Sequence, residues 1–296
     1  MKMKILGDVK EFLNSMGFDT FVYRGGCFDL AARRDRFILL KVLTNVDSFQ
    51  KEQAKDLKLL SRLLEAHCFL IGNRTRKETL DTATMYERFG IPTMAIETFK
   101  ETIGGKPPER LRTRGGLFAK LKPRKLRELR KERDMTQEEL AEKIGVSQKN
   151  ISEHESGKER VFLSVVSAME ELFGERLRQE VDPFGPEKMD IEKGKKAIQG
   201  GMLSILKGLG ISAHPIQRAP PHYVMKHETV VLSRQGVGRG LKTLAEFSRI
   251  SGSEAFVVSE ENEERAALPV IKKEELKELD GPGELIKVLK ERKENT

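Results

Sequence analysis

The chain has 296 residues, of which 54 are lysine or arginine and 46 are aspartate or glutamate, so its formal net charge is +8. This length is sufficient for two or three domains, each with its own core. The sequence contains no apolar run of about 18 residues and no signal-peptide pattern, so we expect a cytoplasmic protein rather than a membrane-bound or secreted one. Its two cysteines, Cys27 and Cys68, lack a metal-ligand spacing and are expected to be buried.

Residues 1–104 are predicted to form an α/β domain. The apolar patterns predict helices over 8–16 and 48–65, strands over 19–23, 27–33, 36–43, 67–72 and 92–96, and a polar, helix-containing segment up to Phe89. Helices that alternate with strands in this way are typical of a layered α/β arrangement.

A strand bearing Asp29, followed by a strand bearing Lys41, resembles the restriction-endonuclease core. In that core an Asp, and then a Glu/Asp-x-Lys on the next strand, bind a divalent metal and activate water. Here Leu39 stands where the second carboxylate belongs, so a hard oxygen ligand is missing. We therefore expect the fold without its chemistry, with no catalytic residue, no metal and no other cofactor.

Residues 105–123 contain GGKPPERLRTRGG, whose glycines, prolines and arginines predict a basic linker. Between residues 106 and 133 there are 12 Lys or Arg and 3 Glu, a net charge of +9. The positive surplus of the chain is therefore concentrated in this stretch, as expected for contacts with phosphates.

Residues 124–180 follow the pattern of a helix-turn-helix. After a first helix over 124–133, Thr136 is expected to cap a second helix, and Glu139 three residues on completes a capping box. Gly145 permits the positive φ of the turn, and Ser147 is expected to cap a third helix that extends to Glu155. The apolar contacts between the second and third helices are assigned to Leu140, Ala141, Ile144, Val146 and Ile151.

The segment TQEELAEKIGVSQKNISEHESGK resembles the phage-repressor (Cro/C1) helix-turn-helix family, also called the XRE type. This resemblance implies a five-helix domain whose third helix reads the major groove, while the Gln that starts the second helix binds a backbone phosphate. It also implies a partly buried ion pair between Arg130 and Glu155, which we expect to be bidentate.

The resemblance, together with the polar outward face of the third helix and the positive charge of the first, assigns contacts with DNA to particular residues of this sequence. The expected base-reading residues are Gln148, Lys149, Asn150, Ser152 and Glu153. The expected phosphate contacts are Gln137, Ser147, Lys158, Arg124 and Lys125.

Residues 197–296 are predicted to form a second α/β domain that repeats the first. Three segments of this region correspond in order to segments of the first domain. They are LKGLGISAHPI, which corresponds to LNSMGFDTFVY, then ETVVLSR, which corresponds to RFILLKVL, and EAFVVSE, which corresponds to HCFLIGN. The glycine-rich stretch 236–240 suits a tight connection better than an anion site. The spacing of His214, His222 and His227 matches no common zinc pattern.

The predicted fold class is α/β plus all-α, with a central five-helix Cro/C1-type domain between two related α/β domains. The chain is similar throughout to an archaeal group of helix-turn-helix regulators, which implies a transcriptional regulator located at the nucleoid. Its expected partners are double-stranded DNA, a second copy of the chain in a homodimer, and an effector ligand or the transcription machinery, but no membrane. Two alternatives stay open: a metal-dependent nuclease targeted by the helix-turn-helix, and a protein-binding assembly factor.

Overall fold

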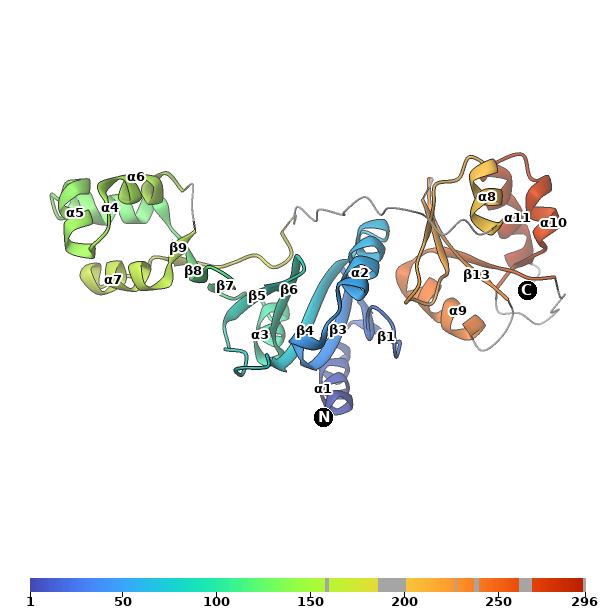
Figure 1. Cartoon of the computed structure of the whole chain (residues 1–296), viewed down its shortest axis with the longest axis horizontal. Coiled ribbons are helices and arrows are strands. Elements are labelled where there is room, and N and C mark those ends of the chain that lie inside the picture. The colour runs from blue at the N-terminus through green and yellow to red at the C-terminus, as the bar shows by residue number, and fades with distance from the viewer. Residues whose placement is uncertain (158–159, 186–200, 227, 237–239, 261–267, 295–296) are drawn as a thin grey trace. The chain divides into compact units, whose positions relative to one another are not determined.

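The computed structural model describes all residues except 158–159, 186–200, 227, 237–239, 261–267 and 295–296 (Figure 1). The chain divides into two compact units. The first unit comprises Met1–Leu70 and Lys188–Thr296, and the second unit comprises Ile71–Glu187. No helix among the described residues combines the length and the apolar character needed to cross a membrane.

The N-terminal half of the first unit contains helices on an antiparallel sheet. Its elements are α1 (Lys2–Ser15), β1 (Asp19–Val22), β2 (Leu30–Arg33), β3 (Phe37–Asn45), the 3-10 turn η1 (Val46–Ser48), α2 (Lys51–Leu63) and β4 (His67–Arg74), which continues into the second unit. Strands β1, β2 and β3 pair in order and antiparallel. Cys27 and Cys68 are both buried, as predicted.

The C-terminal half of the first unit repeats this order of elements. Its elements are α8 (Gly201–Gly208), β11 (Ala213–Pro215), β12 (Tyr223–Lys226), β13 (Val230–Gln235), α9 (Gly240–Ser251), β14 (Glu254–Val258), β15 (Val270–Ile271), α10 (Lys273–Glu278) and α11 (Pro282–Glu294). Strands β11, β12 and β13 are antiparallel, whereas β13, β14 and β15 are parallel. Both halves thus begin with helix, three antiparallel strands, helix and strand, which supports the predicted repeat.

The two halves of the first unit share an aromatic core. The ring of Phe247 on α9 lies 5.8 Å from that of Phe21, 5.3 Å from that of Phe28 and 6.4 Å from that of Phe37. Phe247 is fully buried. At the same boundary Arg33 donates a hydrogen bond of 2.8 Å to the carbonyl of Ser251.

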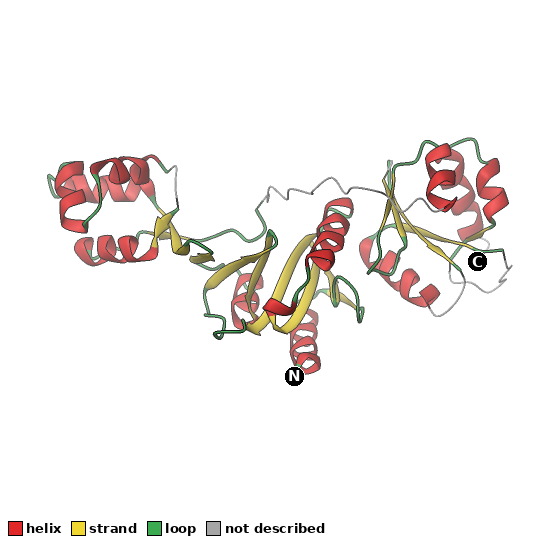
Figure 2. Ribbon diagram, in the orientation of Figure 1, coloured by secondary structure: helices red, strands yellow, loops and turns green. Residues whose placement is uncertain are grey.

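The second unit combines a sheet with a helical bundle, as Figure 2 shows by colour. Its elements are β5 (Thr84–Arg88), β6 (Ile91–Ala95), α3 (Ile96–Ile103), β7 (Arg110–Thr113), β8 (Gly116–Leu121), α4 (Pro123–Glu132), α5 (Gln137–Ile144), α6 (Gln148–Ser156), β9 (Val161–Phe162), α7 (Leu163–Phe173) and β10 (Arg178–Gln179). The strands follow the order β6-β5-β7-β8-β10, and β9 pairs with β8.

Three predictions about this unit were wrong. The stretch 105–123 is not a plain linker, because β7 and β8 form an antiparallel hairpin there. The polar segment before Phe89 contains β5 rather than a helix, and its buried residues Thr84 and Tyr86 follow the two-residue period of a strand. The described part of residues 124–180 holds four helices and two short strands instead of five helices.

Candidate nucleic-acid interface

Side-chain caps determine where α5 and α6 begin. Thr136 Oγ1 accepts a hydrogen bond of 3.1 Å from the amide of Glu139, and the Glu139 carboxylate accepts one of 2.7 Å from the amide of Thr136. Gly145 ends α5 with a φ of 76°, and Ser147 Oγ accepts a hydrogen bond of 3.2 Å from the amide of Asn150. These are the capping box, the turn and the cap that the sequence predicts.

The inner face of the helix-turn-helix is apolar and closely packed. Leu140 and Ala141 on α5 and Ile151 on α6 are buried in one core with Leu126 and Leu129 of α4. The neighbouring Ile144 and Val146 are partly buried against the same core. With this face turned inward, the opposite face of α6 must point to solvent.

The predicted base-reading residues lie on the outward face of α6. Gln148, Lys149, Asn150 and Ser152 are exposed, and Glu153 is half-buried. The Nζ of Lys149 lies 3.6 Å from Oε1 of Glu153, one helical turn away, which brings a cation and an acceptor together on this face. The face therefore offers donors and acceptors of the kinds that base edges in the major groove require.

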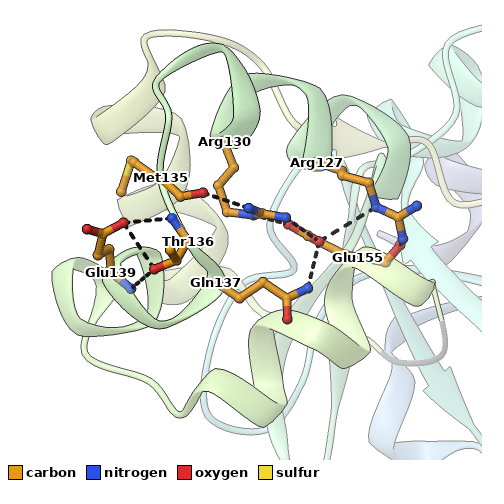
Figure 3. A network of polar contacts seen from close by, with 7 residues as sticks. All are labelled: Arg127, Arg130, Met135, Thr136, Gln137, Glu139 and Glu155. Atoms are coloured by element: carbon orange, nitrogen blue, oxygen red, sulfur yellow. Dashed lines mark hydrogen bonds and ion pairs between the residues drawn. The ribbon is translucent and has the colours of Figure 1, made fainter.

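A buried ion pair joins the first helix of this domain to the end of α6 (Figure 3). Arg130 Nε donates to Glu155 Oε1 at 2.6 Å, and Arg130 Nη2 donates to Glu155 Oε2 at 3.1 Å, so the pair is bidentate as expected. Arg130 Nη1 also donates to the carbonyl of Met135 at 2.7 Å. The side chain of Glu155 is 1% exposed.

Gln137 and Arg127 complete this network in a way the sequence did not indicate. Gln137 Nε2 donates to Glu155 Oε2 at 2.8 Å, and Arg127 Nε lies 3.6 Å from the same oxygen. Gln137 was predicted to bind phosphate. One of its two amide hydrogens is donated to Glu155, so a phosphate could accept a hydrogen bond from the other. The network therefore couples the start of α5 to the end of α6.

The network also determines the charge state of Glu155. Burial alone would raise the pKa of this carboxyl group, but hydrogen bonds from Arg130 and Gln137, with the charges of Arg130 and Arg127, outweigh burial. The pKa of Glu155 therefore lies below its usual range. The bond to Glu155 correspondingly raises the pKa of Arg130.

The other predicted phosphate contacts lie around the same domain. Ser147 and Arg124 are exposed, and Lys125 is half-buried with its Nζ 3.9 Å from Glu175 Oε2. Lys158 lies outside the described residues.

The nuclease-like residues lie in the first unit and form a cluster of ion pairs. Asp29 Oδ1 accepts a hydrogen bond of 2.8 Å from Lys2 Nζ. Asp29 Oδ2 accepts one of 2.9 Å from the amide of Val42 and lies 3.4 Å from Lys41 Nζ. Leu39, at the position of the absent carboxylate, is fully buried. Among the described residues no group of three or more His, Cys, Asp or Glu could hold a metal ion, and this cluster does not fit one.

The repeated half carries different residues at the equivalent positions. The amide of Asp29 donates to the carbonyl of Leu40, and the amide of His222 donates to that of Ser233 in the same way. His222 and Arg234 therefore stand in the places of Asp29 and Lys41, so this half lacks the carboxylate as well. His227 and residues 237–239 of the glycine-rich stretch lie outside the described residues.

Two known protein families match separate parts of the chain. A PD-(D/E)XK superfamily domain matches residues 2–108, and a helix-turn-helix matches residues 126–179. No solved structure matches the chain significantly.

Several proteins provisionally named as HTH-type transcriptional regulatory proteins are similar over nearly the whole chain. The protein from Pyrococcus furiosus is 35% identical, with 97% of each chain covered. The relative from Methanothermobacter thermautotrophicus is 32% identical, with 98% of this chain and 96% of its own covered. The relative from Pyrococcus horikoshii is 31% identical, with 98% of each chain covered. The chain therefore belongs to the family of these HTH-type transcriptional regulatory proteins.

Proposed function

We propose that this protein is a sequence-specific DNA-binding transcriptional regulator that reads the major groove with α6. The proposal rests on a row of exposed polar residues on α6, namely Gln148, Lys149, Asn150 and Ser152. The helix itself is capped by Ser147 and joined to α4 by the buried Arg130–Glu155 pair. A recognition helix must be presented rigidly, because each base contact depends on hydrogen bonds of defined length and direction. The names of the relatives agree with this function.

Replacing Gln148 with alanine is expected to weaken binding to the preferred duplex by about 1 to 3 kcal/mol and to relax the preference at one base position. The preferred duplex is first selected from a random pool with the whole protein, and the variant is then put through the same selection. Arg124→Ala serves as the comparison, because loss of a phosphate contact should weaken all sequences alike. An unchanged motif with Gln148→Ala would show that α6 is not the recognition helix.

We further propose that the working form is a symmetric homodimer. One helix-turn-helix reads only a few base pairs of DNA. A second copy related by a two-fold axis multiplies the ratio of the affinity for the specific site to the affinity for non-specific DNA. The selected motif is therefore expected to contain inverted half-sites about 34 Å apart, one helical turn of DNA. Light scattering should give the mass of two chains at micromolar concentration. A monomer that selects a motif without inverted symmetry would contradict this proposal.

We infer that the PD-(D/E)XK-like half contributes its fold and not a nuclease activity. The match to that superfamily favours an enzyme, but Asp29 is bonded to two ammonium groups and one backbone amide. With Leu39 in place of a second carboxylate, too few oxygen ligands face a divalent cation. The remaining tasks of the flanking halves would be to hold the partner subunit and to bind an effector or the transcription machinery at the nucleoid.

A further inference from the structure

The strands β8, β9 and β10 form part of the helix-turn-helix domain. Ala119 and Leu121 of β8 and Val161 of β9 are buried in the same core as Leu126 of α4 and Ile151 of α6. Their backbones are paired as well, Ala119 with Val161 and Leu121 with Arg178 of β10. This small sheet is therefore held at a defined position relative to the recognition helix.

The other face of the small sheet is exposed and carries an aromatic pair. Side chains alternate between faces along a strand, so Phe118 and Lys120 of β8 point away from the core that contains Ala119 and Leu121. Phe118 is paired with Phe162 of β9, and their ring centroids are 4.5 Å apart. The side chain of Phe162 is 52% exposed, although burying a phenylalanine is worth about 1.5 to 3 kcal/mol. The pair therefore leaves part of an apolar surface in contact with solvent on the outer face of the sheet.

Three exposed cations lie on the strands that carry the aromatic pair or directly beside them. Lys120 is exposed two residues along β8 from Phe118, and Arg160 is exposed directly before β9. Arg114 is exposed in the turn between β7 and β8. That turn lies close to the pair, because a Cβ placed on Gly116 would come within 3.2 Å of the Phe162 ring. The surface thus combines two aromatic rings with three positive charges.

We propose that this face of the small sheet makes a second contact with the same duplex, on the sugar–phosphate backbone beside the groove read by α6. The inference rests on the proposed DNA-binding function. The phosphates of a duplex would neutralise the positive charges of Arg114, Lys120 and Arg160. A second copy of the chain docked through this face across a two-fold axis would instead bring the same positive charges against each other, which is unfavourable. The rings would pack on deoxyribose or enter the minor groove, where apolar side chains can act as wedges.

The position of the sheet in the fold agrees with a shared duplex. Helix α6 ends at Ser156, and β9 begins at Val161. A Cβ placed on Gly157 would come within 3.2 Å of Pro123, the first residue of α4, which follows β8 after a single residue. The end of the recognition helix, the start of α4 and the small sheet therefore meet at one end of the domain. Arg124, a predicted phosphate contact, lies there too.

The test measures duplex affinity as a function of salt for the whole protein and for the variants Lys120→Gln and Phe162→Ser. Lys120→Gln is expected to lower affinity for all sequences several-fold and to reduce the slope of log K against log salt by about 0.9, the effect of one phosphate contact. Phe162→Ser should also lower affinity, with the selected motif unchanged in both variants. Hydroxyl-radical footprints should lose protection at the edge of the site. Lys207→Gln, at an exposed position on α8 in the first unit, removes the same charge and should change none of these quantities.

The outcomes separate this inference from the proposed function. If the unaltered protein bound no duplex, or Gln148→Ala left the motif unchanged, the proposed function itself would fail. If Gln148→Ala relaxed the motif while Lys120→Gln and Phe162→Ser kept full affinity, slope and footprint, only the second contact would be overturned. Conversion of a dimer to a monomer by Phe162→Ser would identify the face as a subunit interface and would also overturn the inference.

Discussion

Replacing Glu155 with alanine is expected to destabilise the second unit by about 3 to 5 kcal/mol, the range for removing one partner of a buried ion pair. The variant leaves Arg130, which is 9% exposed, without either carboxylate oxygen, and Gln137 loses its acceptor. Urea unfolding followed by circular dichroism measures the change. Glu153→Ala is the matched control, because the ion pair that Glu153 makes among the described residues is with the exposed Lys149, and its loss should cost less than about 0.5 kcal/mol. Equal losses for the two variants would contradict a dominant role for the buried pair.

The lowered pKa of Glu155 adds a pH dependence to this prediction. A carboxyl group whose pKa is lower in the folded than in the unfolded state stabilises the fold above its unfolded pKa, and this contribution disappears as the pH falls through the folded pKa. The stability lost in Glu155→Ala should therefore be largest near neutral pH and shrink in acid. Glu155→Gln, which cannot ionise, should show a flatter acid profile than the unaltered protein.

Replacing Asp29 with alanine is expected to destabilise the first unit by about 3 kcal/mol or more, because it leaves the ammonium group of Lys41 buried without its carboxylate. Lys41 is 2% exposed, and burial lowers its pKa against the opposing effect of Asp29. Lys2→Ala is the matched control: the Lys2 side chain is 38% exposed, so its loss should cost less than about 1 kcal/mol. A stable Asp29→Ala variant would show that this cluster does not support the fold.

The same variant tests whether the first unit cleaves DNA. The unaltered protein is expected to leave duplex DNA intact in Mg²⁺ or Mn²⁺, since the residues around Asp29 do not provide a divalent cation with enough oxygen ligands. Cleavage that required the metal and vanished in Asp29→Ala, at a temperature where circular dichroism shows that the variant is folded, would establish a nuclease instead.

The ends of α5 and α6 could be predicted because their signals are local. Thr136 and Glu139, or Ser147 and Asn150, are three residues apart, so the bonds between them form within one turn of helix. The positive φ of Gly145 follows equally from its place in the turn. The pair between Arg130 and Glu155 spans 25 residues and was expected only because the segment resembles the Cro/C1 family.

The hairpin of β7 and β8 shows where composition misleads. Glycine, proline and arginine in GGKPPERLRTRGG are typical of a linker, yet Leu111 and Ala119 are buried when the two strands pair. Two further partners of β8 are distant in the sequence, since Ala119 pairs with Val161 and Leu121 with Arg178. The composition of residues 104–116 alone cannot predict that β8 pairs with strands some 40 to 60 residues later in the sequence.

The amino-acid sequence by itself determined the helix-turn-helix, its caps, the exposed face of α6 and the repeated order of elements in the first unit, because each depends on periodicity or on neighbours within a few residues. Only the tertiary structure decided that Gln137 donates to Glu155, that Lys2 and Lys41 both pair with Asp29, and that the rings of Phe118 and Phe162 lie against each other. These contacts join side chains from separate elements, and their distances are set by how the sheet and helices pack. No spacing along the chain specifies that packing.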